Sequence, residues 1–259
     1  MKIMIIGLGR MGSWLAREML ASGHQVAAFD IRPDTIRPSG AAILSDMREI
    51  AVFQPDMLLN AVNIKETIPA FNSIEAFLPP DCLLADITSI KNGLASFYGQ
   101  CGRSFVSIHP MFGPRFADLN EIEGENLIII DESDLRGMEF FRAFAAGRRL
   151  RCWEMDFTAH DCMMGYSLTL PFAASITLAA CINGGEVPGT TFARHLELAR
   201  NLLLEDDQLL IEILFNRHSL EQIDKICGRL QFLKHVITAR DQAEATQFLA
   251  RLRSNIHPN

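Results

Sequence analysis

The sequence predicts an α/β fold in which a doubly wound, mostly parallel sheet is followed by an all-helical region. Short apolar runs alternate with segments of helical periodicity through the first 155 residues, whereas only helical segments follow residue 156. The chain has 259 residues, of which 49% are hydrophobic and 21% charged, so a substantial core can form. We therefore expect two domains, residues 1–155 and residues 156–259.

The N-terminal domain is predicted from apolar runs that end at turn-forming residues and are separated by amphipathic segments. The predicted strands are Lys2–Ile6, Gln25–Phe29, Met57–Ala61, Cys82–Asp86, Ser104–Ile108, Asn126–Ile130 and Arg149–Glu154. The predicted helices between them are Met11–Ala21, Asp46–Val52, Glu66–Phe77, Ile90–Tyr98 and Asp134–Ala146.

The C-terminal domain is predicted to begin with a long apolar helix, for which Thr158 is the expected N-cap. Its most apolar stretch, Met163–Ile182, is interrupted by Ser, Thr, Pro and Gly, so we expect a buried helix rather than a membrane span. A glycine-rich loop, Asn183–Gly189, follows it. The remaining predicted helices are Thr190–Leu204, Asp207–Asn216, Leu220–Ala239 and Asp241–Asn255.

Composition excludes several classes of protein. The net charge is −7 and no long basic run occurs, which argues against a nucleic-acid partner. The first apolar run is too short for a signal peptide. The six cysteines form no Cys-x-x-Cys pair, so neither a disulfide framework nor a zinc site is indicated. We expect a cytoplasmic protein with reduced thiols and with no bound metal, membrane or nucleic acid.

A glycine motif follows the first predicted strand and opens the first helix. It reads Gly7-Leu8-Gly9-Arg10-Met11-Gly12. In a Gly-x-Gly-x-x-Gly motif the first glycine permits a tight turn, the second lets the backbone approach a pyrophosphate, and the third lets helix pack on strand. The N-terminus of the helix offers amide donors to phosphate. The motif and its flanking elements predict a Rossmann-like domain that binds a dinucleotide through residues Gly7, Gly9, Arg10, Met11 and Gly12.

The second predicted strand is followed by an acidic residue, Asp30, which lies 18 residues beyond Gly12. A carboxylate at this spacing accepts hydrogen bonds from the adenosine ribose and repels a 2′-phosphate, so NAD is favoured over NADP. Arg32 complicates the prediction, because it could stack on the adenine or soften the rejection of NADP.

Polar residues also follow two later strands of the predicted sheet. His109 comes directly after one apolar run and is followed by a Pro/Gly-rich turn, and Ser89 and Lys91 follow another strand. Ligands collect at the carboxyl ends of parallel strands, so these side chains are candidates for a common site. Taken singly, Ser89 could be an N-cap, Lys91 a solvated residue of the first helical turn and His109 a core or surface residue.

Two segments together carry a resemblance to a known family. The segment Asp86-Ile87-Thr88-Ser89-Ile90-Lys91-Asn92-Gly93, followed by His109-Pro110-Met111-Phe112-Gly113-Pro114, resembles the prephenate dehydrogenase family, which includes arogenate dehydrogenases. The glycine motif, His160-Asp161 at the start of the long helix and the helical second half fit that family too. A looser likeness covers Thr191–Ala199, which contains Arg194.

The resemblance implies an NAD-dependent oxidative decarboxylation in tyrosine biosynthesis, of prephenate to 4-hydroxyphenylpyruvate or of arogenate to tyrosine. It implies that His109 accepts the proton of the ring hydroxyl, with Ser89 hydrogen-bonded to the same hydroxyl or orienting the imidazole. Lys91 and Arg194 would bind substrate carboxylates, and His160 would either lie on the substrate side or support a residue that contacts the substrate. A homodimer formed through the helical domain is also implied.

Alternatives remain open at this point. Arg115, just after the His109 motif, departs from the family pattern. As a cation near the substrate it would disfavour the ammonium of arogenate and favour prephenate, but it could also be an exposed loop residue. The glycine motif and Asp30 also resemble β-hydroxyacid dehydrogenases, yet residues 158–167 lack the lysine which that family uses. A non-catalytic NAD sensor would explain the glycine motif but not the placement of His109.

Overall fold

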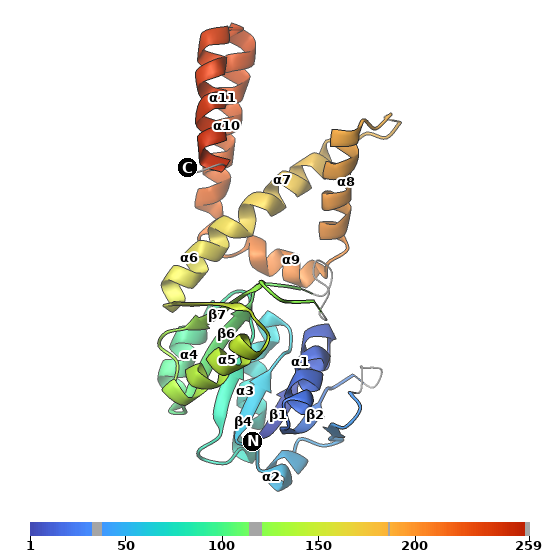
Figure 1. Cartoon of the computed structure of the whole chain (residues 1–259), viewed down its shortest axis with the longest axis vertical. Coiled ribbons are helices and arrows are strands. Elements are labelled where there is room, and N and C mark those ends of the chain that lie inside the picture. Colours follow the sequence, from blue (N-terminus) through green and yellow to red (C-terminus); the bar gives the residue numbers. More distant parts are fainter. Residues whose placement is uncertain (33–37, 114–120, 186, 257–259) are drawn as a thin grey trace.

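Eight strands form one sheet in the order β3-β2-β1-β4-β5-β6-β7-β8 in the computed structural model of the chain (Figure 1). The structure describes residues 1–32, 38–113, 121–185 and 187–256. All neighbouring strands are parallel except β6 and β7, which are antiparallel. The strands are β1 (Lys2–Ile6), β2 (Gln25–Phe29), β3 (Ala42–Ile43), β4 (Met57–Asn60), β5 (Leu83–Asp86), β6 (Phe105–Pro110), β7 (Asn126–Ile130) and β8 (Arg151–Met155).

Helices cover both faces of the sheet, because consecutive strand residues point to opposite faces and both sets are apolar. On one face α1 (Arg10–Ala21) and α5 (Leu135–Gly147) bury Trp14 and Phe141 against the strands. On the other face α2 (Glu49–Phe53), α3 (Thr67–Ile74) and α4 (Leu94–Cys101) pack, burying Phe71 and Tyr98. Two 3₁₀ turns, η1 (Ile64–Glu66) and η2 (Glu75–Phe77), flank α3. The predicted doubly wound sheet is therefore confirmed.

The sheet differs from the prediction in three places. The short strand β3 was not predicted, and β6 continues through His109 and Pro110 instead of ending at Ile108. Between β6 and β7 the described residues contain no helix. A parallel connection requires a long crossover, so β7 returns antiparallel to β6. His109 consequently lies in the part of β6 that pairs with β7, opposite Ile128, rather than in a loop.

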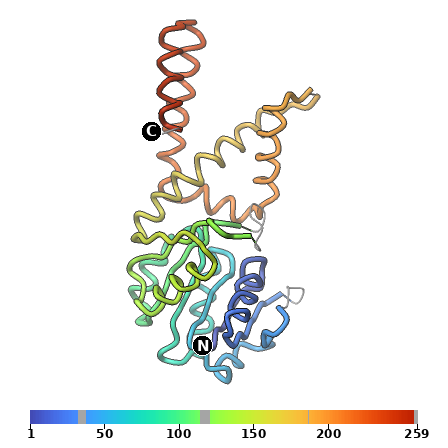
Figure 2. The backbone as a smooth tube through the Cα atoms, in the orientation of Figure 1, coloured from blue at the N-terminus to red at the C-terminus, as the bar shows by residue number. Residues whose placement is uncertain are grey.

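The chain is helical beyond the sheet, as predicted (Figures 1 and 2). The helix α6 begins at Phe157, because the carboxylate of Asp156 accepts a hydrogen bond from the N–H of Ala159; the expected cap at Thr158 was wrong. The last two helices run side by side and project away from the sheet, with Phe232 and Phe248 in contact at 5.0 Å between ring centroids. The helices are α6 (Phe157–Ser167), α7 (Thr169–Ala180), α8 (Thr190–Leu203), α9 (Asp207–Leu214), α10 (Ser219–Ala239) and α11 (Gln242–Ile256).

The helices α6 and α7 form a nearly continuous 24-residue segment, Phe157–Ala180, which is long and apolar enough to cross a membrane by length and composition. The expectation that this segment does not span a membrane stays a prediction. The expected burial is not seen within the described chain, since only 22% of the most apolar window is buried there. One helix of this kind is weak support for a membrane protein, because a helix covered by another chain has the same composition.

Candidate active site

The glycine loop between β1 and α1 has the geometry of a phosphate-binding turn. Gly7 has φ +86°, and a Cβ there would lie 2.7 Å from the backbone nitrogen of Val62. A Cβ on Gly12 would lie 1.9 Å from the carbonyl oxygen of Gly7, so only glycine lets α1 approach the turn. A Cβ on Gly9 would meet nothing within 4 Å. The backbone at Gly9 is thus open to a ligand, while Gly7 and Gly12 are needed for packing.

A cavity of about 460 Å³ opens beside this loop and is lined by Gly7, Gly9 and Asp30, among others. One oxygen of Asp30 accepts the N–H of Leu8 at 2.7 Å, and the other accepts the N–H of Arg32 at 2.8 Å. Burial alone would raise the pKa of Asp30, but the hydrogen bonds from Arg32 and Leu8 outweigh it and lower the pKa. Asp30 therefore presents a fixed carboxylate to the cavity, as a ribose-binding residue must.

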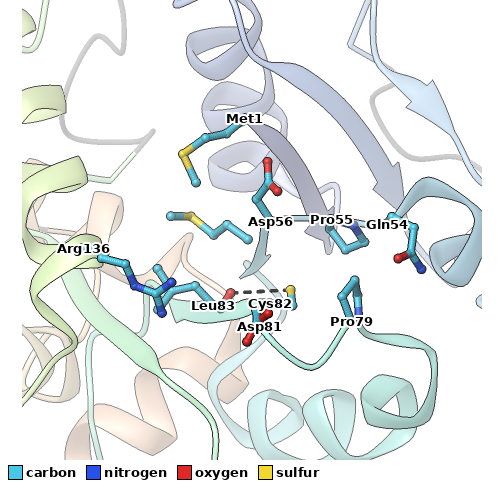
Figure 3. A pocket seen from close by; sticks show the side chains of 10 residues that line it. Met1, Gln54, Pro55, Asp56, Pro79, Asp81, Cys82, Leu83 and Arg136 are labelled. Carbon is cyan, nitrogen blue, oxygen red and sulfur yellow. Dashed lines mark hydrogen bonds between the residues drawn. The ribbon is translucent and has the colours of Figure 1, made fainter.

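A second cavity, of about 540 Å³, lies where β1, β4 and β5 begin, and thus at the edge of the sheet opposite the glycine loop (Figure 3). Met1, Asp56, Asp81 and Arg136 line it, and none of the residues predicted for catalysis does. Cys82, which also lines it, is no nucleophile at neutral pH, because burial raises the pKa of its thiol to about 12. This cavity therefore offers no chemistry that matches the predicted site.

Three side chains form a buried hydrogen-bonded chain at the carboxyl edge of the sheet. The Nδ1 atom of His109 lies 3.0 Å from Nε2 of His160, and Nδ1 of His160 lies 3.1 Å from Oδ1 of Asp161. His109 is 6% exposed and His160 is fully buried. The helix α6 supplies His160 and Asp161, and β6 supplies His109. The hydrogen bonds among these side chains therefore join the sheet to the helical region.

These hydrogen bonds fix which nitrogen of His109 carries the proton. The carboxylate of Asp161 can only accept, so Nδ1 of His160 donates to it and Nε2 of His160 must accept. His109 then donates from Nδ1 and keeps an unprotonated Nε2. Burial, followed by repulsion from His160 and Lys91, holds the pKa of His109 well below its usual value, and burial likewise lowers the pKa of His160. His109 is therefore a neutral base with a free lone pair at Nε2.

Lys91 is not placed for the predicted substrate contact. Its side chain has no exposed surface, and its Nζ lies 2.7 Å from both Oδ1 of Asp86 and the carbonyl oxygen of Ile108. His160 is not on the substrate side either, because both ring nitrogens are bound inside the protein. Both polar side chains find internal partners and are buried with them, so Lys91 departs from its predicted contact, whereas His160 fits the supporting role that the resemblance also allows.

The other predicted residues are placed as follows. Ser89 is half-buried in the loop after β5, and no described hydrogen bond joins it to His109. Arg194 is exposed on α8, and none of the described ion pairs or hydrogen bonds connects it to His109 or His160. Arg10 is exposed and Met11 half-buried at the start of α1. Arg115 lies outside the described residues. The structure thus brings together His109 and His160, but it does not bring Arg194 to them within one chain.

Asp86 and Asp161 are site residues that sequence reasoning missed. Asp86 ends β5 and holds Lys91, while Asp161 orients His160. Each stands within five residues of a predicted site residue, Lys91 and His160 respectively, and that proximity is the available sequence signal. An acidic residue beside a histidine or lysine is nevertheless common on solvated surfaces, so proximity alone does not reveal a buried partner.

Acid should destabilise the protein through these two histidines. Because folding lowers the pKa values of His109 and His160, the unfolded chain binds more protons than the folded chain as the pH falls below about 6.5. We expect the free energy of unfolding to decrease from about pH 7 to pH 5 and the decrease to be shallower in His109→Asn. Urea unfolding at several pH values measures how the free energy of unfolding changes with pH. The control is His195→Asn, at an exposed position, which should leave this dependence unchanged. Equal slopes in His109→Asn and the unaltered chain would contradict this account.

Comparisons with known proteins show what the chain is similar to. Residues 2–96 match the family described as the NAD binding domain of 6-phosphogluconate dehydrogenase. The chain is 22% identical to arogenate dehydrogenase 1, chloroplastic, of Arabidopsis thaliana, over 98% of this chain and 42% of that protein. It is 24% identical to the T-protein of Enterobacter agglomerans, over 96% of this chain and 64% of that protein. The chain thus spans less than two thirds of the length of these curated relatives.

A solved structure shares the whole fold. Prephenate dehydrogenase from A. aeolicus, in complex with hydroxyphenyl propionate and NAD+, superposes with a TM-score of 0.84 at 19% identity. The likeness covers 98% of this chain and 96% of that one. It extends through the helical region as well as the sheet, so the order of the two parts is shared too.

The glycine loop, the cavity beside it and Asp30 define a class of protein, one with an NAD-binding Rossmann domain followed by a helical region. Within that class, the chain is most like prephenate and arogenate dehydrogenases among the proteins described above, the same family that its sequence motifs resemble. The expected cofactor, NAD, is the ligand of the matched domain.

Proposed function

We propose that the chain is an NAD-dependent prephenate dehydrogenase, which converts prephenate to 4-hydroxyphenylpyruvate with loss of carbon dioxide. The observation that carries the proposal is the buried chain from Asp161 through His160 to His109. It prepares a neutral imidazole at the edge of the sheet where parallel strands place ligands, and a hydroxyl oxidation at neutral pH needs such a base. Arogenate dehydrogenase is the second candidate, supported by similarity to an arogenate dehydrogenase.

His109 manages the proton of the ring hydroxyl. Its Nε2 accepts that proton while a hydride leaves the ring carbon that bears the hydroxyl. The imidazolium that develops is stabilised through His160 by the charge of Asp161. When the carboxyl group leaves as carbon dioxide and the ring becomes aromatic, the imidazolium can return the proton to the phenolate oxygen. Atoms and charge then balance, and the base is regenerated without a second proton donor.

The cofactor site fits NAD. Bound there, NAD accepts the hydride. The open backbone at Gly9 and the N-terminus of α1 would hold the pyrophosphate, and the carboxylate of Asp30 would accept from the ribose hydroxyls and repel a 2′-phosphate, which favours NAD over NADP. Ser89, which follows β5, is proposed to contact the ring hydroxyl, and Arg194 a substrate carboxylate.

Turnover of the purified chain tests this function. Prephenate, arogenate and a β-hydroxyacid are each supplied with NAD or NADP, and the formation of reduced nicotinamide is followed by absorbance. We expect the fastest turnover with prephenate and NAD. Faster turnover of arogenate would favour the second candidate. Turnover of a β-hydroxyacid alone would mean that the protein is a β-hydroxyacid dehydrogenase. Binding of NAD with no turnover of any of these substrates would contradict the proposal and favour a sensor.

We further propose that the protein is a cytoplasmic homodimer that binds neither membrane nor nucleic acid. All six cysteines are free, which suits a reducing compartment. The helical region exposes large apolar side chains on several helices, including Leu230, Leu233 and Ile237 on α10 and Leu249 on α11. A second copy of the chain would remove this surface and the exposed face of α6 and α7 from water.

The oligomeric state should respond to a charge placed on this surface. We expect the chain to sediment at twice its 28.9 kDa mass and Leu233→Glu to shift it towards the monomer, because a buried unpaired carboxylate opposes association. Gln231→Glu adds the same charge at an exposed polar position and is the matched control. A monomer that binds lipid vesicles through α6 and α7 would instead show that a membrane covers the exposed face of these two helices.

A further inference from the structure

Lys91 occupies an unusual position, since a lysine is rarely buried without a specific reason. It lies in the loop between β5 and α4, before the helix begins at Leu94, and its side chain is fully buried. Its Nζ donates to Oδ1 of Asp86, the last residue of β5, and to the carbonyl oxygen of Ile108 on β6. Both distances are 2.7 Å. The ammonium therefore connects the carboxyl ends of two neighbouring strands.

The carbonyl that Lys91 holds belongs to the peptide that joins Ile108 to His109. Fixing this oxygen fixes the plane of that peptide and, with it, the direction in which the imidazole of His109 leaves the strand. Beyond Ser107, β6 has no register partner on β5 and pairs only with β7. The ammonium of Lys91 thus supplies a bond on the side where the ladder has ended.

The backbone of Lys91 acts on the same histidine from the other side. Its N–H donates to Oδ1 of Asp161 at 2.9 Å, the same oxygen that lies 3.1 Å from Nδ1 of His160. Asp161 is therefore held in place to orient His160, which in turn bonds Nδ1 of His109. One residue contacts both ends of the arrangement that fixes the proposed base.

We propose that Lys91 is a positioning residue, whose ammonium orients His109 through the Ile108 carbonyl and whose backbone N–H orients it through Asp161 and His160. The inference rests on the proposed function, in which His109 is the base. It replaces the expectation that Lys91 binds a substrate carboxylate, which would require Lys91 to leave Asp86 and enter solvent-exposed space.

The charged surroundings of His109 support this role. Among the residues that the structure describes, the ionisable groups that face the imidazole or its partners are His160 and Asp161 on α6, Asp86 on β5 and Lys91 itself. Among them Lys91 is the cation, and its charge adds to burial and to repulsion from His160 in lowering the pKa of His109. The lysine therefore helps to keep the base unprotonated near neutral pH.

The test must remove the ammonium without leaving a buried carboxylate unpaired. Lys91→Met alone would strand the charge of Asp86 and could prevent folding. The double variant Asp86→Asn with Lys91→Met removes both charges at similar volume. The amide oxygen introduced at position 86 can still accept from the hydroxyl of Thr88, which bonds Oδ1 of Asp86 at 2.7 Å. The amide nitrogen at position 86 can donate to the hydroxyl oxygen of Tyr98. Lys2→Met is the matched control, because Lys2 also bonds a carbonyl oxygen, that of Phe53, but at the opposite edge of the sheet.

Two measurements on the full chain give the answer. Steady-state kinetics with prephenate and NAD should show kcat lowered by about 10²-fold with KM nearly unchanged, the effect of a displaced base. The ¹⁵N spectrum of the imidazole, taken without substrate and assigned by its loss in His109→Asn, should show His109 titrating at a higher pH and populating both tautomers. Lys2→Met should leave both measurements unchanged.

The opposite results would overturn the proposal. A folded double variant with unchanged titration and tautomer of His109, and with KM raised about tenfold, would mean that Lys91 binds substrate after all. If the unaltered chain turns over neither prephenate nor arogenate, the proposed function fails, but the ¹⁵N spectrum still decides the role of Lys91. In that case an unchanged His109 signal in the double variant overturns the positioning role on its own.

Discussion

Replacing His109 with Asn should lower kcat for prephenate by about 10²–10⁴-fold, the usual contribution of a general base. An asparagine amide can still donate to Nε2 of His160, so the buried hydrogen-bonded chain is preserved. It cannot accept and hold a proton at neutral pH, so only the chemistry is lost. Because the glycine loop and Asp30, which are proposed to bind NAD, follow β1 and β2 rather than β6, the affinity for NAD should stay within a factor of about two or three.

The control for this variant is His24→Asn, since His24 precedes β2 at the opposite edge of the sheet. Kinetics give kcat and KM for each protein, and calorimetry gives the affinity for NAD. His24→Asn should match the unaltered chain in all three. If His109→Asn kept turnover within about tenfold of the unaltered chain, His109 would not be the base, and the tautomer that Asp161 imposes on it would have no role in the reaction.

The parts of the structure that the sequence predicted are those set by local patterns. Most strands of the sheet are short apolar runs and they alternate with helical segments, so the order of the predicted elements follows from the chain itself. The glycine motif is likewise local, because Gly7, Gly9 and Gly12 act within one turn and its first helical residues. Even the placement of His109 at the carboxyl edge needed only the end of one apolar run.

The parts that could not be predicted depend on contacts between distant residues. A lysine five residues after an aspartate usually lies on a solvated surface, but Lys91 is buried because Ile108, seventeen residues further on, offers a carbonyl oxygen. The start of α4 shifts to Leu94 because Gly93 adopts φ +80°, which ends the loop that carries Lys91 inward. His160 meets His109 across 51 residues of sequence. Burial of a polar residue is decided by such partners and not by its neighbours in the chain.

Replacing Gly12 with Ala should destabilise the protein by about 3 kcal/mol or more, or prevent its folding. The added Cβ would lie 1.9 Å from the carbonyl oxygen of Gly7 and 3.1 Å from the Cβ of Ala61. The first contact is with backbone, so no side-chain rotation can relieve it, and α1 must move away from β1. That movement would expose Trp14 and Leu15, which are buried on the same helix. Urea unfolding followed by circular dichroism measures the loss.

Two glycines with open surroundings distinguish this packing effect from a general intolerance of substitution. A Cβ on Gly99, within α4, or on Gly9, at the N-cap of α1, meets nothing within 4 Å. Gly99→Ala should stabilise the chain by up to about 1 kcal/mol, because alanine favours a helix more than glycine does. Gly9→Ala should leave the free energy of unfolding nearly unchanged while weakening NAD binding, since its methyl group would occupy the space that a pyrophosphate needs. If Gly12→Ala were as stable as these two variants, the close packing of α1 on the turn would not be what confines position 12 to glycine.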